Sequence, residues 1–70
     1  MTDEKISGQQ RSNIQIGSSV EVVQKQDQRT GNLTPGIVSK ILTNSAIHPH
    51  GIKVRLESGE VGRVKWVLPE

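Results

Sequence analysis

The sequence predicts an all-β fold in one small domain. Short stretches in which apolar and polar residues alternate are separated by polar segments rich in Gly, Asn, Gln and Pro, which is typical of strands joined by loops. The chain has 70 residues, 31% of them hydrophobic, and Trp66 is its single residue of the Phe, Tyr and Trp class. So small a chain supports only a shallow core, which favours a closed barrel without open sheet edges.

The beginning of the chain predicts a tail followed by one turn of helix. Residues 1–7 are polar and show no periodic pattern, so we expect a disordered tail there and a single domain over residues 8–70. Ser7-Gly8-Gln9-Gln10 has the form of a capping box, which indicates a helix start. We therefore expect a short helical turn at about residues 9–13.

Two strands and two loops follow along the chain. Val20 and Val22 alternate with other residues over Ser19–Lys25, which predicts the first strand. Gln26–Thr34 is a polar loop, and Pro35-Gly36 is expected to break the chain before a second strand over Ile37–Leu42. Both faces of that strand carry apolar residues, which leaves its inward face open. Thr43–Gly51 is the second polar loop.

The last two strands form the clearest pair. Alternation over Ile52–Glu57 and Val61–Val67 places apolar side chains on one face of each strand, and on this pattern Trp66 belongs in the core. Cross-strand partners share a face, so the numbers of paired residues must add up to an even total. A two-residue turn would give an odd total. We therefore predict a three-residue turn, Glu57-Ser58-Gly59, with Gly59 left-handed.

This register gathers positive charge on the outer face of the hairpin, where four cations are expected together: Lys53, Arg55, Arg63 and Lys65. The order of strand, long loop, strand, long loop and hairpin predicts an SH3-like barrel of four to five antiparallel strands. In such a barrel the loops Gln26–Thr34 and Thr43–Gly51 meet on one rim. Loops of this length in a small domain are often functional, so the rim is a second candidate surface.

Much of the chain resembles the YwbE family of small uncharacterised proteins. The resemblance runs from about Gly8 to Val67 and is carried by these stretches: Lys25-Gln26-Asp27-Gln28-Arg29-Thr30-Gly31, Leu33-Thr34, Ile41-Leu42-Thr43-Asn44-Ser45, His48-Pro49-His50-Gly51-Ile52-Lys53-Val54-Arg55-Leu56 and Val61-Gly62-Arg63-Val64. Pro35 departs from it, because the resemblance implies a basic residue at that position. Gly17–Ile41 is also loosely similar to the KOW element of ribosomal and transcription-elongation proteins, which implies contact with RNA or protein within a KOW-like barrel.

The composition excludes several classes of function. No cysteine is present, so the chain forms no disulfide, thiol nucleophile or Cys-based metal site. No apolar stretch approaches the roughly 20 residues that span a bilayer, and no signal-peptide pattern opens the chain; we expect a cytoplasmic monomer without membrane contact. A barrel this small leaves little room for a pocket that excludes water, so we expect neither an enzyme nor a cofactor.

The charge balance favours a polyanionic partner. The formal net charge is +2, but residues 6–69 alone carry +4, which suits a nucleic acid; a solubilising surface is the alternative. The candidate binding residues are Lys25, Arg29, Thr30, His48, His50, Lys53, Arg55, Arg63 and Lys65.

Polar loop residues suggest contact with phosphate rather than metal. Arg29 and Thr30 could present a guanidinium fork and hydrogen-bond donors to a phosphate. His48 and His50 project to the same side of an extended segment, and with Asp27 they could hold a metal, but no further ligand pattern supports one. We predict no metal, and a phosphate or partner contact that strengthens as the histidines protonate near pH about 6.5.

Two functions follow, both of them binding. The first is RNA binding, alone or on a ribosome-associated surface, through the hairpin face and the loop rim. With no aromatic side chain to spare, we expect backbone and shape recognition rather than base stacking. The alternative is a protein-interaction adaptor that uses loops 26–34 and 43–51. Charge reversals at Lys53, Arg55 and Arg63 would abolish the first function, whereas Arg29→Ala or His50→Ala would abolish the second.

Overall fold

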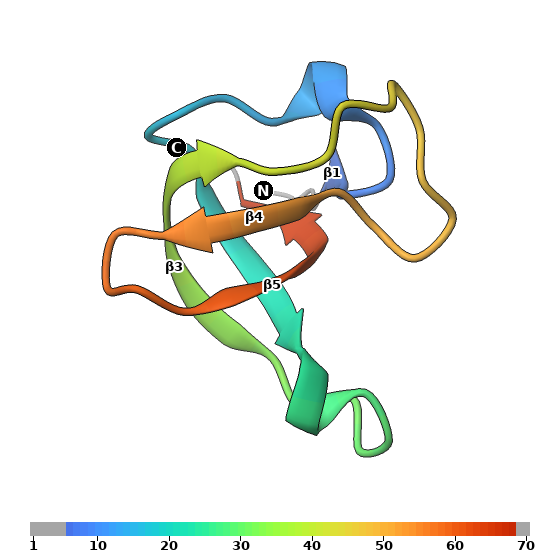
Figure 1. The fold of residues 1–70 in the computed structure, drawn as a ribbon, viewed down its shortest axis with the longest axis vertical. Helices are drawn as coiled ribbons and strands as arrows, with labels where there is room; N and C mark the ends of the chain where they lie inside the picture. Colours follow the sequence, from blue (N-terminus) through green and yellow to red (C-terminus); the bar gives the residue numbers. More distant parts are fainter. Residues whose placement is uncertain (1–5, 69–70) are drawn as a thin grey trace, which may run out of the picture.

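Antiparallel pairing joins all five strands of the computed structural model, which describes residues 6–68 (Figure 1). The strands are β1 (Ile6–Ser7), β2 (Ser19–Gln24), β3 (Thr34–Ile41), β4 (Lys53–Leu56) and β5 (Val61–Val67). Their order is β1-β5-β2-β3-β4, and β4 also pairs with β5. Strands β2 to β5 therefore close into a four-stranded barrel with β1 added to it. The all-β prediction and the SH3-like barrel are confirmed.

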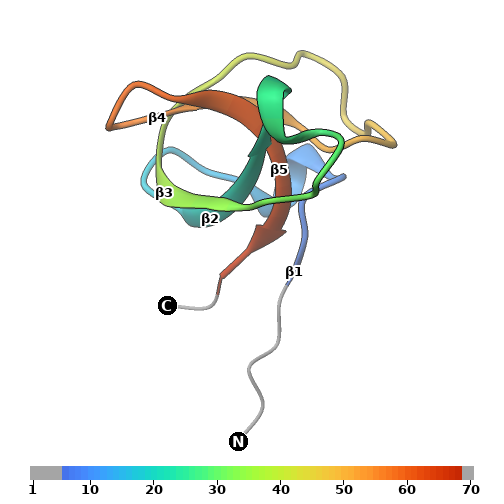
Figure 2. The same ribbon diagram turned by 90° about the horizontal axis from the view of Figure 1, so that it is seen from below.

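The strands curve around the centre of the barrel (Figure 2). Aliphatic side chains fill that centre. The core consists of residues that are at most 6% exposed: Ile14, Val20, Val22, Val38, Ile52, Val54, Leu56, Val64 and Val67. The predicted alternation in the first strand and in Ile52–Glu57 is therefore confirmed. Val38 settles the inward face of the second predicted strand, since it is fully buried whereas its neighbours are not.

The N-terminal segment is more structured than the sequence suggests. Ile6 and Ser7, placed in the tail by sequence, pair with Val67 and Trp66 of β5; residues 1–5 of that tail lie outside the described residues. The expected helical turn is η1 (Arg11–Asn13), but the capping box does not form. Its serine hydroxyl instead accepts a hydrogen bond from the Gln9 backbone N–H at 3.2 Å.

The remaining helical segment is a second three-residue turn, η2 (Lys25–Asp27), at the start of the first long loop. Across residues 6–68, no helix is long and apolar enough to cross a membrane.

The tight hairpin between β4 and β5 has the predicted register. Lys53 pairs with Arg63 and Val54 with Gly62, and these pairs have the even totals that the buried faces require. The Leu56 N–H donates to the Glu60 carbonyl at 2.8 Å, which leaves the predicted three-residue turn between them. Its last residue, Gly59, has φ +103°. The hairpin prediction is confirmed.

Pro35-Gly36 does not break the chain before the second long strand, and that expectation is wrong. Both residues lie inside β3, where Pro35 pairs with Glu21. The Ile37 carbonyl accepts a hydrogen bond from the Glu57 N–H, just beyond the end of β4. The nitrogen of Pro35, two residues earlier, points to the same side of β3. Because β4 has already ended there, no strand needs a backbone N–H from residue 35. Gly36 lies under Leu56, whose Cδ1 would come within 2.6 Å of a Cβ atom there.

Two β-bulges shift the alternation of the longer strands. In β3 the partners of Val38 and Lys40 are consecutive, which leaves Ser39 as the extra residue. The Ser39 hydroxyl lies 3.1 Å from the Arg55 carbonyl and 3.3 Å from the Leu56 carbonyl, and donates there. Each bulge places two consecutive residues outward before the next side chain turns inward. In β3 the second of these outward residues is Lys40.

The second bulge corrects the prediction for Trp66. On β5 the partners of Val64 and Trp66 are consecutive, which leaves Lys65 as the extra residue. Trp66 consequently lies on the outside of the barrel and is only half-buried, while Val67 takes the inward position at 6% exposure. The expectation of a core tryptophan is wrong, because strict alternation does not hold across a bulge.

Candidate functional site

Cations from three neighbouring strands and one turn form the first candidate surface. Lys53 lies directly opposite Arg63 across β4 and β5, and Lys40 lies opposite Arg55 across β3 and β4. Lys25, the first residue of η2, lines a shallow hollow together with Lys53 and Arg63. We call these five residues the basic face. The sequence predicted Lys53, Arg55 and Arg63 there; Lys40 was missed because its outward position depends on the bulge at Ser39.

The pairing of like charges on the basic face lowers the stability of the free protein. Like charges placed directly opposite each other destabilise an antiparallel pair by a fraction of a kcal/mol, roughly 0.2–1. Within residues 6–68, none of the side chains of Lys40, Lys53 and Arg55 is paired with a carboxylate. Two like-charged pairs on adjacent strands therefore leave positive potential that an external anion would relieve.

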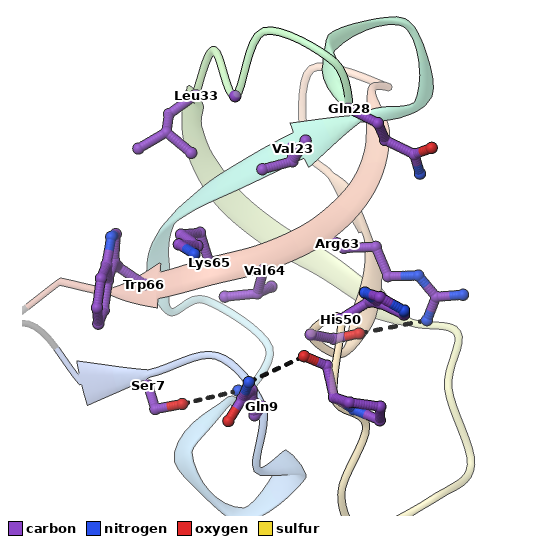
Figure 3. A pocket seen from close by; sticks show the side chains of 13 residues that line it. Ser7, Gln9, Val23, Gln28, Leu33, His50, Arg63, Val64, Lys65 and Trp66 are labelled. Atoms are coloured by element: carbon purple, nitrogen blue, oxygen red, sulfur yellow. Dashed lines mark hydrogen bonds between the residues drawn. The ribbon is translucent and has the colours of Figure 1, made fainter.

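A groove of about 850 Å³ runs along the outer side of β5 and forms the second candidate surface (Figure 3). Its floor carries Arg63, Lys65 and Trp66. The first long loop borders it with Gln28 and Leu33, and the second borders it from the other side with Pro49, His50 and Gly51. The two loops predicted to share a rim therefore border one groove. Lys65 lines this groove rather than facing β4, because the hairpin pairs end at Lys53 and Arg63 and Lys65 lies beyond them.

Hydrogen bonds to the N-terminal segment position the second loop. The His48 N–H donates to the Gln9 carbonyl, and Gln9 Nε2 donates to the Pro49 carbonyl, both at 2.9 Å. Gly51 lies against β5 with φ +100°, where a Cβ atom would come within 2.3 Å of the Val64 carbonyl oxygen. Only glycine allows this approach. It brings His50 to the edge of the groove.

Arg63 connects the two candidate surfaces. Its Nη1 donates to the Gly51 carbonyl at 3.2 Å, which holds the guanidinium between the second loop and β5. The same side chain lines both the groove and the hollow of the basic face. A ligand that follows β5 would therefore meet Arg63 from either surface.

His48 and His50 form a local pair whose rings lie 5.8 Å apart. His48 Nδ1 accepts a hydrogen bond from the His50 backbone N–H at 3.1 Å, which requires an unprotonated nitrogen. Partial burial, followed by the positive charges of Arg63 and His50, lowers the pKa of His48 below its usual 6.5. This ring therefore protonates at lower pH than the sequence-based expectation supposed. Among the described residues, no three His, Cys, Asp or Glu side chains converge as a metal site would need.

Arg29 and Thr30 are not brought to either surface. Arg29 is exposed and lines neither the groove nor the hollow. The Thr30 hydroxyl donates to the Asp27 carbonyl and accepts from the Asn32 N–H, both at 3.4 Å, and the Gly31 N–H donates to Asp27 as well. These polar groups close the loop on itself, which local sequence could not distinguish from groups presented to a ligand.

Trp66 is the groove residue that sequence reasoning placed elsewhere. Its half-buried ring lies 5.8 Å from Lys65 Nζ, measured to the ring centroid. The sequence does carry one signal: the apolar residues Trp66 and Val67 are consecutive, which strict alternation after Val64 does not allow. Only one residue of such a doublet can point inward, and the doublet alone does not say which one.

Comparison with known proteins finds relatives whose names state no activity. A family model described as "Uncharacterized conserved protein (DUF2196)" matches residues 7–67. The chain is also 57% identical over 63 residues to "Uncharacterized protein YwbE" of Bacillus subtilis (strain 168), which covers 90% of this chain and 97% of that protein. No solved structure matches the chain. The resemblance to the YwbE family is confirmed.

Proposed function

Since the chain belongs to the DUF2196 family of uncharacterized conserved proteins, whose name gives no activity, we propose a function from its surface: it binds RNA, alone or as part of a ribonucleoprotein, and catalyses no reaction. The observation that carries this proposal is the direct pairing of Lys53 with Arg63 and of Lys40 with Arg55. These pairs cost stability in the free protein and become favourable when phosphates lie between them.

The side chains of the basic face suit phosphate groups. Arg55 and Arg63 can each donate two parallel hydrogen bonds to a phosphate, while Lys53 supplies a compact charge. The outer face of the hairpin is open, with Lys53 and Arg55 both exposed, so an extended polyanion can reach all of these groups at once. Contacts to phosphate carry no sequence preference by themselves. The proposed binding is therefore electrostatic and sensitive to salt.

A charge-reversal series tests the proposal. Arg55→Glu removes a cation from the basic face, and Arg11→Glu changes the net charge equally on η1, which lines neither the hollow nor the groove. The double variant Lys53→Glu with Arg55→Glu loses two charge-assisted contacts of about 1.5–3 kcal/mol each. We expect it to bind RNA at least about a hundredfold more weakly, in fluorescence anisotropy titrations at several salt concentrations.

The salt dependence provides the second measure of the same experiment. Each single-strand phosphate contact contributes roughly 0.7 to the slope of log affinity against log salt, so the double variant should lose about 1.4 from that slope. Arg11→Glu should keep the wild-type slope. Equal binding by Arg55→Glu and Arg11→Glu, or wild-type binding that does not respond to salt, would contradict the proposal. Thermal melting checks that each variant folds.

A further inference from the structure

Trp66 is a large apolar side chain that the fold holds at its surface. The bulge at Lys65 turns it outward, and Val67 fills the core position instead. A tryptophan that is only partly buried forgoes part of the free energy that full burial would release. In Figure 3 the ring stands at one end of the groove, next to Lys65. A flat apolar surface is thus available to a ligand at this end of the groove.

The surroundings of the ring select the kind of ligand. Within residues 6–68, none of the side chains that line the groove is acidic, whereas Arg63, Lys65 and His50 are basic. Glu21, which pairs with Trp66 across β2 and β5, is not among the lining residues. Leu33, 37% exposed, adds apolar surface on the loop side. This combination fits a ligand with a flat apolar part and a negative charge close to it.

We infer that the groove binds one unpaired nucleotide of a single-stranded RNA, with its base stacked on Trp66 and its neighbouring phosphates on Lys65, Arg63 and His50. The inference rests on the proposed RNA-binding function and narrows it to unpaired RNA. Stacking on an exposed aromatic ring beside a basic track is how proteins hold single strands without reading their sequence. The volume of about 850 Å³ falls within the range of roughly 300–1,000 Å³ of small-molecule sites.

The position of Arg63 extends the site to a continuous track. Because Arg63 lines the groove and also pairs with Lys53 on the basic face, the strand can leave the groove and continue over β4. A duplex could use the phosphate contacts, but its bases are stacked on one another and their faces are closed to Trp66. The groove therefore distinguishes single-stranded from duplex RNA, whereas the basic face does not.

Trp66 itself reports on the test, since it is the single tryptophan of the chain. Intrinsic fluorescence is measured while the protein is titrated with a short oligouridine, with a duplex RNA of equal length and with inorganic polyphosphate. We expect the oligouridine to quench the emission, and the duplex and the polyphosphate to leave it nearly unchanged. Trp66→Leu should weaken oligouridine binding roughly tenfold, with binding of the duplex unchanged; Trp66→Phe should restore most of the loss.

The possible failures of this inference and of the proposed function are distinct. If oligouridine binds in a salt-dependent way but leaves the emission unchanged, and Trp66→Leu binds it as well as the wild type, stacking is overturned and the basic face stands. If no RNA binds at low salt, both are overturned. Equal weakening by Trp66→Leu and Trp66→Phe would also overturn stacking, because phenylalanine keeps a ring. Thermal melting of both variants shows whether the fold survives the change.

Discussion

The basic face and the groove use similar cations in different surroundings. The basic face has no walls and no aromatic side chain, and its charges face one another across adjacent strands. The groove has loops on both sides and an aromatic ring on its floor. Cations alone provide affinity for any polyanion, whereas cations beside an exposed ring add a preference for unpaired bases. Under the proposed function, the basic face supplies affinity for RNA and the groove supplies selectivity for unpaired bases.

Both regions depend on a bulge. The extra residue Ser39 turns Lys40 toward the basic face, and the extra residue Lys65 turns Trp66 toward the groove. Without these bulges, strict alternation would place each of these side chains on the opposite face of its strand. Bulges are common beside functional sites because they redirect side chains in this way.

Arg63→Gln is the single substitution expected to affect both regions most strongly. It removes a cation shared by the basic face and the groove, together with the hydrogen bond from Arg63 to the Gly51 carbonyl. We expect affinity for oligouridine and for duplex RNA to fall together, each by about tenfold or more. Titrations with both ligands, measured by anisotropy, check this. If affinity fell for only one of the two ligands, the claim that Arg63 serves both surfaces would be contradicted.

The pKa of His48 provides a smaller effect, which reports on how Arg63 acts on the loop that borders the groove. Because the pKa in the folded state lies below the usual 6.5, the unfolded chain takes up this proton first. The neutral ring therefore stabilises the fold above pH about 6.5, and this contribution is lost as the pH falls toward the folded-state pKa. Arg63→Gln removes one cause of the lowered pKa, so the pKa of His48 should rise.

An NMR titration of the imidazole protons measures this pKa directly. Arg11→Glu serves as the control and should leave the value unchanged, since Arg11 is not among the groups that lower it. A pKa that stays the same in Arg63→Gln would show that the charge of Arg63 does not act on His48.

Elements controlled by local alternation could be predicted from the sequence, and the hairpin shows why. Its register followed from the need to bury Ile52, Val54 and Leu56 on one face, and the structure has that register. The placement of Pro35 could not be predicted in this way. It depends on where β4 ends, because only there does β3 lack a partner for a backbone donor.

The candidate site was predictable only in part, for the same reason. Lys53, Arg55 and Arg63 followed from the hairpin register, but Trp66 did not, since a single extra residue reverses the side on which every later side chain lies. Arg29 stays a prediction, since it is exposed but lines neither the groove nor the hollow. Its loop looks like a phosphate-binding turn in the sequence, yet the loop's backbone and Thr30 hydrogen bonds are spent on closing it.

Backbone amide shifts during a titration with oligouridine test the central claim most directly. The account predicts that the largest changes fall on β4 around Lys53 and Arg55, on β5 from Arg63 to Trp66, and on His50, with the Trp66 indole N–H among them. Arg11 should not respond. Changes confined to the first long loop around Arg29, or no changes at all at low salt, would contradict the claim that the basic face and the groove together bind single-stranded RNA.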